Sequence, residues 1–160
     1  PACSVSKGNP GVSINEEVEL LRQIPLFAKI EPSKLKLLAF TSERLKFKSD
    51  EELFHQGDIG DSAYIVIGGQ ADVILSTDRG DVVVSTVKRN DIVGEVAILC
   101  DVPRTASVKA KEDLEVLKIS KDLFFRMISE FPQMSVEIMR ELAARLDRTT
   151  DQLMRAVSQN

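Results

Sequence analysis

Between Glu43 and Ser120 the sequence alternates short apolar runs with glycine-containing dipeptides, and this pattern restricts the fold more than any other feature. Glycine supplies the backbone freedom that tight turns require. Where the runs are half apolar, apolar and polar side chains alternate, as they do in a strand with one buried face. Three strands are predicted from these runs, at residues 63–67, 71–76 and 82–87. Short strands at this spacing predict a small antiparallel barrel or jelly-roll.

Helical periodicity flanks this region on both sides. Val18, Leu21 and Ile24 share one face of a predicted helix, and Pro32 is placed to start a second. After Ser120 an apolar stripe with helical spacing extends to residue 131, and a long helix is then predicted to about residue 157. Helices therefore precede and follow the predicted strands.

Composition excludes several classes of function. With 160 residues, 43% of them hydrophobic, the chain can build one domain with a real core. The net charge of −4 disfavours nucleic acid and acidic membranes as partners, and no apolar run is long enough for membrane insertion. Cys3 and Cys100 are far apart and are expected to be reduced thiols in a cytoplasmic protein. Since His55 is the only histidine, no metal site is expected.

Residues 91–110 carry the candidate binding chemistry. Gly94 lets the backbone approach a ligand, and Glu95 opens a short helical turn whose N-terminus presents unpaired N–H groups. Arg104 then enters a predicted strand, where a residue at the strand edge is expected to lie outside the core. Arginine can hold phosphate oxygens with two parallel bonds, and glutamate can accept a bond from a sugar hydroxyl. These residues suit a ligand with one anionic phosphate and a ribose hydroxyl, although a simple surface ion pair between Glu95 and Arg104 is the alternative.

Residues 94–99 and 103–107 resemble the phosphate-binding cassette of cyclic-nucleotide-binding domains. This family includes the regulatory subunits of protein kinase A, cyclic-nucleotide-gated channels and the bacterial catabolite activator protein. The glycine-containing stretches at residues 54–58, 60–66 and 69–73 are similar to the β-roll of the same family. The resemblance therefore extends well beyond the cassette.

The resemblance implies an α+β fold. It consists of an antiparallel β-roll (jelly-roll-like barrel) with N-terminal helices, a short phosphate-binding helix and a long C-terminal helix. The domain is expected at residues 16–158, after a flexible N-terminal tail at residues 1–15.

The resemblance also implies roles for individual residues. Glu95 would accept the ribose 2′-hydroxyl, and Arg104 would hold the cyclic phosphate. The rest of the implied ligand-binding cassette is Gly94, Val96, Ala97, Thr105 and Ala106. Val96, together with Ile98 or Leu99, is expected to pack on the barrel side.

The nucleobase is less closely specified. In the catabolite activator, two neighbouring hydroxyl residues on the long helix lie at the adenine amino group, which implies Thr149 or Thr150 here, one of them from a partner subunit. The alternative is that both threonines face solvent or a helix seam. Thr105 is similar to a threonine that helps to hold cyclic GMP in the channel branch. Cyclic AMP is the expected ligand, cyclic GMP stays open, and no cofactor is expected.

The long C-terminal helix has two interpretations. Its apolar residues fall near heptad positions, with a polar threonine in one core slot: Met139, Leu142, Leu146, Thr149, Leu153 and Ala156. Such a helix can pack on its own barrel or form the seam of a homodimer, and three heptads suffice for either.

The function implied by the resemblance is a bacterial sensor for signal transduction. Cyclic nucleotide binding would change its conformation and so regulate an unknown downstream protein. No enzyme activity is expected, because the sequence supplies neither a histidine cluster nor an activated nucleophile. Since the chain ends at Asn160 without a helix-turn-helix, we expect no DNA binding by this chain. The alternative is a regulatory domain fragment of a larger channel, kinase-type or other signalling protein, or a cyclic GMP receptor.

Overall fold

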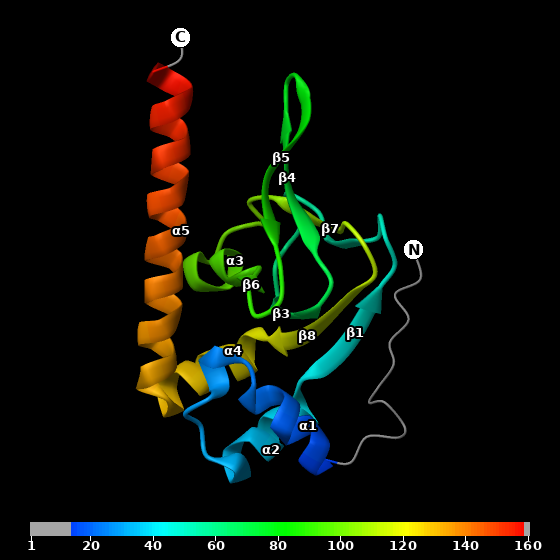
Figure 1. Cartoon of the computed structure of the whole chain (residues 1–160), viewed down its shortest axis with the longest axis vertical. Helices are drawn as coiled ribbons and strands as arrows, with labels where there is room; N and C mark the ends of the chain where they lie inside the picture. Colours follow the sequence, from blue (N-terminus) through cyan, green and yellow to red (C-terminus); the bar gives the residue numbers. More distant parts are fainter. Residues whose placement is uncertain (1–13, 159–160) are drawn as a thin grey trace.

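The structure is a computed structural model in which residues 14–158 are described. Figure 1 shows a β-roll with short helices at one end and a long helix running along one side. The expected tail at residues 1–15 lies almost entirely outside the described residues, as does Cys3. In chain order the elements are α1 (Ile14–Arg22), η1 (Pro25–Phe27), α2 (Pro32–Thr41), β1 (Glu43–Phe47), β2 (Glu52–Phe54), β3 (Ser62–Gly68), β4 (Ala71–Thr77), β5 (Gly80–Val87), β6 (Ile92–Val93), α3 (Glu95–Cys100), β7 (Ser107–Ala110), β8 (Leu114–Ser120), α4 (Lys121–Glu130) and α5 (Pro132–Ser158).

Two four-stranded antiparallel sheets form the roll. Their strand orders are β1-β8-β3-β6 and β2-β7-β4-β5, so most neighbours in space are not neighbours in sequence. The long-range β3–β8 pair sets Ala63 opposite Ile119 and Val66 opposite Val116, whereas β4 and β5 form a local hairpin. The predicted α+β class with an antiparallel β-roll is confirmed.

Strand β3 is buried on both faces because its sheet lies between the helices and the second sheet. Ala63 and Ile65 belong to the apolar cluster that contains the helices, and Tyr64 and Val66 belong to the cluster inside the roll. The alternation follows from the two-residue period of a strand. It explains why residues 63–67 read as a continuous apolar run.

The two halves of α5 have different environments. Met134 and Ile138 are buried in the helix-side cluster, and Leu142 packs against it. Beyond Arg145 every described residue of α5 is exposed, and Leu146 is 68% exposed. Only the first half of the helix therefore packs on the chain's own barrel. The apolar side chains of the second half, among them Leu146 and Leu153, are exposed in the single chain.

None of the helices within residues 14–158 combines the length and the apolar character needed to cross a bilayer. Within the same residues, no three histidine, cysteine or acidic side chains gather closely enough to hold a metal ion. Cys100 is a free, exposed thiol.

Candidate functional site

A cavity of about 510 Å³ lies between the β-roll, α3 and the middle of α5. The predicted site residues that line it are Gly94, Glu95, Val96, Ala97, Arg104, Thr105, Ala106 and Thr149. In two other hollows of similar volume, about 540 and 550 Å³, the charged residues of the lining are exposed or half-buried. In contrast, this cavity brings a fully buried carboxylate and a buried guanidinium into one site.

Not every residue of the predicted site reaches the cavity. Thr150 is absent from its lining, and its hydroxyl donates to the carbonyl of Leu146 at 2.9 Å. Of the two alternatives expected to pack on the barrel side together with Val96, Ile98 is buried in the helix-side cluster and Leu99 is exposed. Val96 is half-buried at the cavity wall.

Arg104 is a buried residue, contrary to the sequence expectation for a strand-edge side chain. Strand β7 begins only at Ser107, so Arg104 lies in the preceding loop, and its exposed fraction is 4%. Its guanidinium donates to the carbonyls of Gly94 (Nη1, 2.8 Å) and Ser62 (Nη2, 2.7 Å). The guanidinium carbon lies 4.1 Å from the centre of the Phe54 ring. A cation this far from water is held in place by carbonyls and an aromatic face.

Two glycines make room for this guanidinium. Gly94 has φ of +87°, which disfavours other residues, and a Cβ there would lie 2.7 Å from Arg104 Nη1. A Cβ on Gly60 would lie 2.9 Å from Arg104 Cζ and 2.6 Å from the Cβ of Ala97. Both positions therefore need glycine for Arg104 to reach the cavity wall.

Glu95 is fully buried and pairs with Arg145 of α5, not with Arg104. Its Oε1 accepts from Arg145 Nη1 at 2.8 Å, and Arg145 Nη2 donates to the carbonyl of Ile92 at 2.8 Å. Burial raises the pKa of Glu95, and the positive charge of Arg145 opposes that rise. The surface ion pair between Glu95 and Arg104, considered from the sequence, is wrong.

Arg145 is a site residue that sequence analysis missed. It lines the cavity and connects α5 to both α3 and β6. One signal was available, because Arg145 stands four residues before Thr149 and so lies on the same face of the helix. Its partner Glu95 is 50 residues away in sequence, and no local pattern predicts that contact.

Two buried side-chain atoms within residues 14–158 have no hydrogen-bond partner, and both belong to this site. They are Oε2 of Glu95 and Nε of Arg104. Buried polar atoms are nearly always paired, so an orphan acceptor and an orphan donor at one cavity point to a ligand. The acceptor suits a hydroxyl group and the donor suits an anionic oxygen. Burial also lowers the pKa of Arg104, while the negative charges of Asp61 and Asp58 oppose that decrease.

The hydroxyl of Thr149 can only accept hydrogen bonds from a ligand in the cavity. Its hydroxyl donates to the carbonyl of Arg145 at 2.9 Å, which uses its single proton. The remaining lone pairs of the oxygen can accept a bond from a ligand, for example from an amino group.

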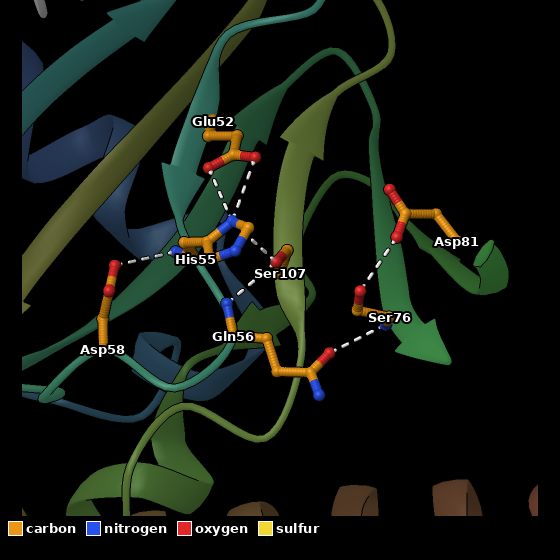
Figure 2. A network of polar contacts seen from close by, with 7 residues as sticks. All are labelled: Glu52, His55, Gln56, Asp58, Ser76, Asp81 and Ser107. Carbon is orange, nitrogen blue, oxygen red and sulfur yellow. Dashed lines mark hydrogen bonds and ion pairs between the residues drawn. The ribbon is translucent and has the colours of Figure 1, made fainter. Parts of the chain in front are cut away.

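A polar network behind the site (Figure 2) has the residue types of a catalytic triad without the geometry of one. Nδ1 of His55 lies 3.2 Å from Oε2 of Glu52 and 3.3 Å from Oγ of Ser107. In a triad, one ring nitrogen meets the acid and the other meets the hydroxyl. Since a single nitrogen makes both contacts here, the histidine cannot relay a proton between them.

The same network has a structural role, because it joins the strands that carry the Arg104 loop. The N–H of Gln56 donates to Ser107 Oγ at 2.8 Å, and its side-chain oxygen accepts from the N–H of Ser76 at 2.8 Å (Figure 2). The next residue, Gly57, donates to the carbonyl of Arg104 at 2.8 Å. Loop 55–58 therefore holds the backbone of Arg104 against β2, β7 and β4.

Known proteins show the same sequence features. A family model described as cyclic nucleotide-binding domain matches residues 44–131. The cAMP-dependent protein kinase regulatory subunit of Emericella nidulans is 33% identical over 108 residues, which are 68% of this chain and 26% of that protein. The CRP-like cAMP-activated global transcriptional regulator of Mycobacterium tuberculosis is 27% identical over 136 residues, 84% of this chain and 61% of that protein.

A solved structure shows the same fold. The cyclic nucleotide-binding domain from Methylobacillus flagellatus superposes with a TM-score of 0.72 at 22% identity, covering 88% of this chain and 82% of that chain. At this identity the likeness concerns the fold alone. The chain spans about a quarter of the length of the kinase regulatory subunit that it matches.

Proposed function

This chain belongs to the cyclic nucleotide-binding domain family, and from that premise we propose that it is a sensor that binds cyclic AMP in the cavity between the β-roll and α5. The observation that carries the proposal is the pair of unpartnered buried atoms, Glu95 Oε2 and Arg104 Nε. A ligand that satisfies both must offer a hydroxyl proton and an anionic oxygen. The ribose 2′-hydroxyl and the cyclic phosphate of a cyclic nucleotide meet these two requirements.

The phosphate end of the proposed complex is built around Arg104. Two of its five N–H donors are used by protein carbonyls, and its Nε–H and other N–H groups remain for phosphate oxygens. A charge-assisted bond of this kind is strong where water is excluded. Phe54 fixes the plane of the guanidinium, so little side-chain freedom is lost on binding.

The base end is proposed to lie against the outer half of the cavity. Its wall on the roll side is apolar and includes Val73, Leu75, Val84 and Val87. Across from this wall, Thr149 can accept a bond from the amino group of adenine. We assign Thr150 no contact within the same chain.

Arg145 provides the physical link between ligand and conformation. It shares the carboxylate of Glu95 with the proposed ribose hydroxyl, and it belongs to α5. A ligand that changes the position of Glu95 therefore changes the contact that holds the middle of α5. Such a ligand shifts the population of α5 arrangements only as far as its affinities for those arrangements differ.

The downstream partner is proposed only as a class of molecule, a protein. The relatives named above regulate a protein kinase or transcription, and this chain matches only part of each. We propose a regulatory role without catalysis, in the cytoplasm, with an unidentified protein that reads the position of α5. The main alternative is that the same domain regulates a channel or kinase as one part of a longer protein, and a second is that cyclic GMP is the messenger.

Calorimetric titration of the purified protein tests the proposal. Cyclic AMP should bind saturably with a dissociation constant in the micromolar range or below, and non-cyclic AMP should give no saturable heat. Unfolding and refolding the protein before titration removes any nucleotide carried over from expression. Absence of binding by cyclic AMP and cyclic GMP alike after that step would contradict the proposed function.

A further inference from the structure

Three arginines line the cavity, and one of them, the exposed Arg148, has no hydrogen bond or ion pair with the rest of residues 14–158. Arg104 donates to two carbonyls, and Arg145 pairs with Glu95. Arg148 also lines the cavity, yet among the described residues its guanidinium has no hydrogen bond or ion pair. A ligand with one phosphate already has Arg104 as its cation, so Arg148 is available for another part of the ligand.

The position of Arg148 along α5 indicates which part. Cavity-lining residues recur on α5 at the spacing of one helix face, namely Arg145, Arg148, Thr149, Gln152 and Leu153. With a rise of about 1.5 Å per residue, Arg148 stands roughly 4.5 Å further along the axis than Arg145. Since Arg145 meets Glu95 at the proposed ribose, Arg148 lies toward the proposed base.

The chemistry of the guanidinium selects between the two purines. Arginine offers only donors. Guanine presents two acceptors side by side, O6 and N7, whereas adenine presents N7 beside a donating amino group. Arg148 can therefore pair with the edge of guanine and meets a donor at the edge of adenine. Thr149, next to it on the helix, offers an acceptor and so has the opposite preference.

We propose that Arg148 is a specificity-determining residue that lets this cavity accept guanine, so that the domain binds cyclic GMP as well as cyclic AMP. The inference rests on the proposed function, because it assumes that the cavity holds a cyclic nucleotide. Adenine is recognised through Thr149 and guanine through Arg148. The two residues lie side by side on one helix and serve different ligands.

The test is calorimetric titration of the wild type, Arg148→Ala and the control Arg155→Ala with cyclic AMP, cyclic GMP and cyclic IMP. Cyclic IMP carries O6 and N7 but lacks the 2-amino group of guanine, so it isolates the proposed edge. Arg148→Ala should weaken cyclic GMP and cyclic IMP by about 5- to 150-fold, the effect of one bidentate base contact. Cyclic AMP should weaken by less than about threefold. Arg155 is exposed on the same helix and is not part of the cavity lining, so Arg155→Ala should leave all three unchanged.

The outcomes separate this inference from the proposed function. Equal weakening of all three nucleotides by Arg148→Ala would overturn the inference, because Arg148 would then supply only positive charge. No change, or a wild type that binds cyclic AMP and not cyclic GMP, would overturn it as well while leaving the proposed function intact. A wild type that binds none of the three would overturn the proposed function and this inference with it. Selective loss of cyclic GMP and cyclic IMP supports the inference.

Discussion

Arg104 combines two tasks that usually fall to different side chains. It fills buried space between Phe54 and the carbonyls of Gly94 and Ser62, and its Nε–H stays without a partner among the described residues. A residue of this kind cannot be removed without some cost to stability. Its role in binding must therefore be tested with a variant that retains the charge.

The first prediction concerns Arg104→Ala and Arg104→Lys. Loss of charge-assisted bonds to phosphate should weaken cyclic AMP binding by about 10- to 150-fold in Arg104→Ala. Arg104→Lys keeps the charge and lacks the planar fork, so it should fall between this variant and the wild type. Titration calorimetry measures both, with Arg126→Ala, an exposed arginine on α4, as the control. Wild-type affinity in Arg104→Ala would show that the phosphate binds elsewhere.

The second prediction concerns the pH dependence of stability through Glu95. Because burial raises its pKa, the folded chain keeps a proton that the unfolded chain has already released. Stability from this group is complete below the usual glutamate pKa of about 4.3 and is lost as the pH rises through the raised value. Glutamine mimics the protonated form and does not titrate.

Urea unfolding of the wild type and Glu95→Gln between about pH 4 and pH 7 measures this effect. The wild type should become less stable relative to Glu95→Gln as the pH rises. Glu141, whose pKa burial also raises, feels the charge of Glu95, so the same comparison is repeated in a Glu141→Gln background. A difference that stays constant over this range would mean that the environment of Glu95 does not disfavour its charge.

At the scale of elements, side chains of Gln56 and Ser107 connect the loop after β2 to β7 and β4. Ser107 is buried and accepts the N–H of Gln56 (Figure 2). Ser107→Ala leaves that donor without its partner, and the free energy of unfolding should fall by about 1–3 kcal/mol. Since the loop also holds the backbone of Arg104, cyclic AMP affinity should decrease too.

Ser76→Ala is the matched control for this prediction. Ser76 belongs to the same network, but its hydroxyl is exposed, and among the residues that the structure describes it bonds only to Asp81, at 3.1 Å. Its loss should change the free energy of unfolding by less than about 0.5 kcal/mol. Equal effects of the two substitutions in urea unfolding would show that the buried bond has no special role.

At the scale of the whole molecule, α5 carries an exposed apolar stripe. The stripe includes Met139, Leu146 and Leu153, each at least 60% exposed and spaced by seven residues. Such spacing is typical of a helix that pairs with another helix. We predict a homodimer through this stripe, which sedimentation equilibrium detects directly.

Leu146→Glu should weaken that dimer at least about tenfold, because it places a charge in the seam. Ala144→Glu is the control, since Ala144 is exposed on the opposite side of the same helix. A wild type that is monomeric with and without cyclic AMP would contradict the prediction. A dimer unaffected by Leu146→Glu would place the interface on another surface.

Local patterns predicted those elements whose own residues form a clear apolar run or a helical period. The strand predicted at residues 63–67 is β3 (Ser62–Gly68), and the long helix ends at Ser158, within a residue of its predicted end. The flanking strands β1 and β2 were not predicted, because β1 is rich in charged residues and β2 has only three residues. Their hydrogen-bond partners lie on β8 and β7, far along the chain.

The same distinction applies to the site. The spacing of Gly94, Glu95 and Arg104 identified the wall of the cavity. The burial of Arg104 and the pairing of Glu95 with Arg145 depend on tertiary contacts, which no single segment encodes. The sequence therefore predicted most of the residues that gather at the cavity, but not Arg145 and not how the charged residues are paired.

The most direct test of the central claim is a thermodynamic cycle that combines Glu95→Gln with removal of the ribose 2′-hydroxyl. Titration calorimetry of the wild type and Glu95→Gln with cyclic AMP and 2′-deoxy cyclic AMP gives the four binding free energies. If Oε2 of Glu95 accepts the 2′-hydroxyl, the two changes should be coupled by about 1–2 kcal/mol. Glutamine replaces the charged acceptor by an amide and the deoxy nucleotide lacks the donor, so each change removes the same charge-assisted bond. Additive effects would contradict the claim, since Glu95 and the ribose hydroxyl would then act independently.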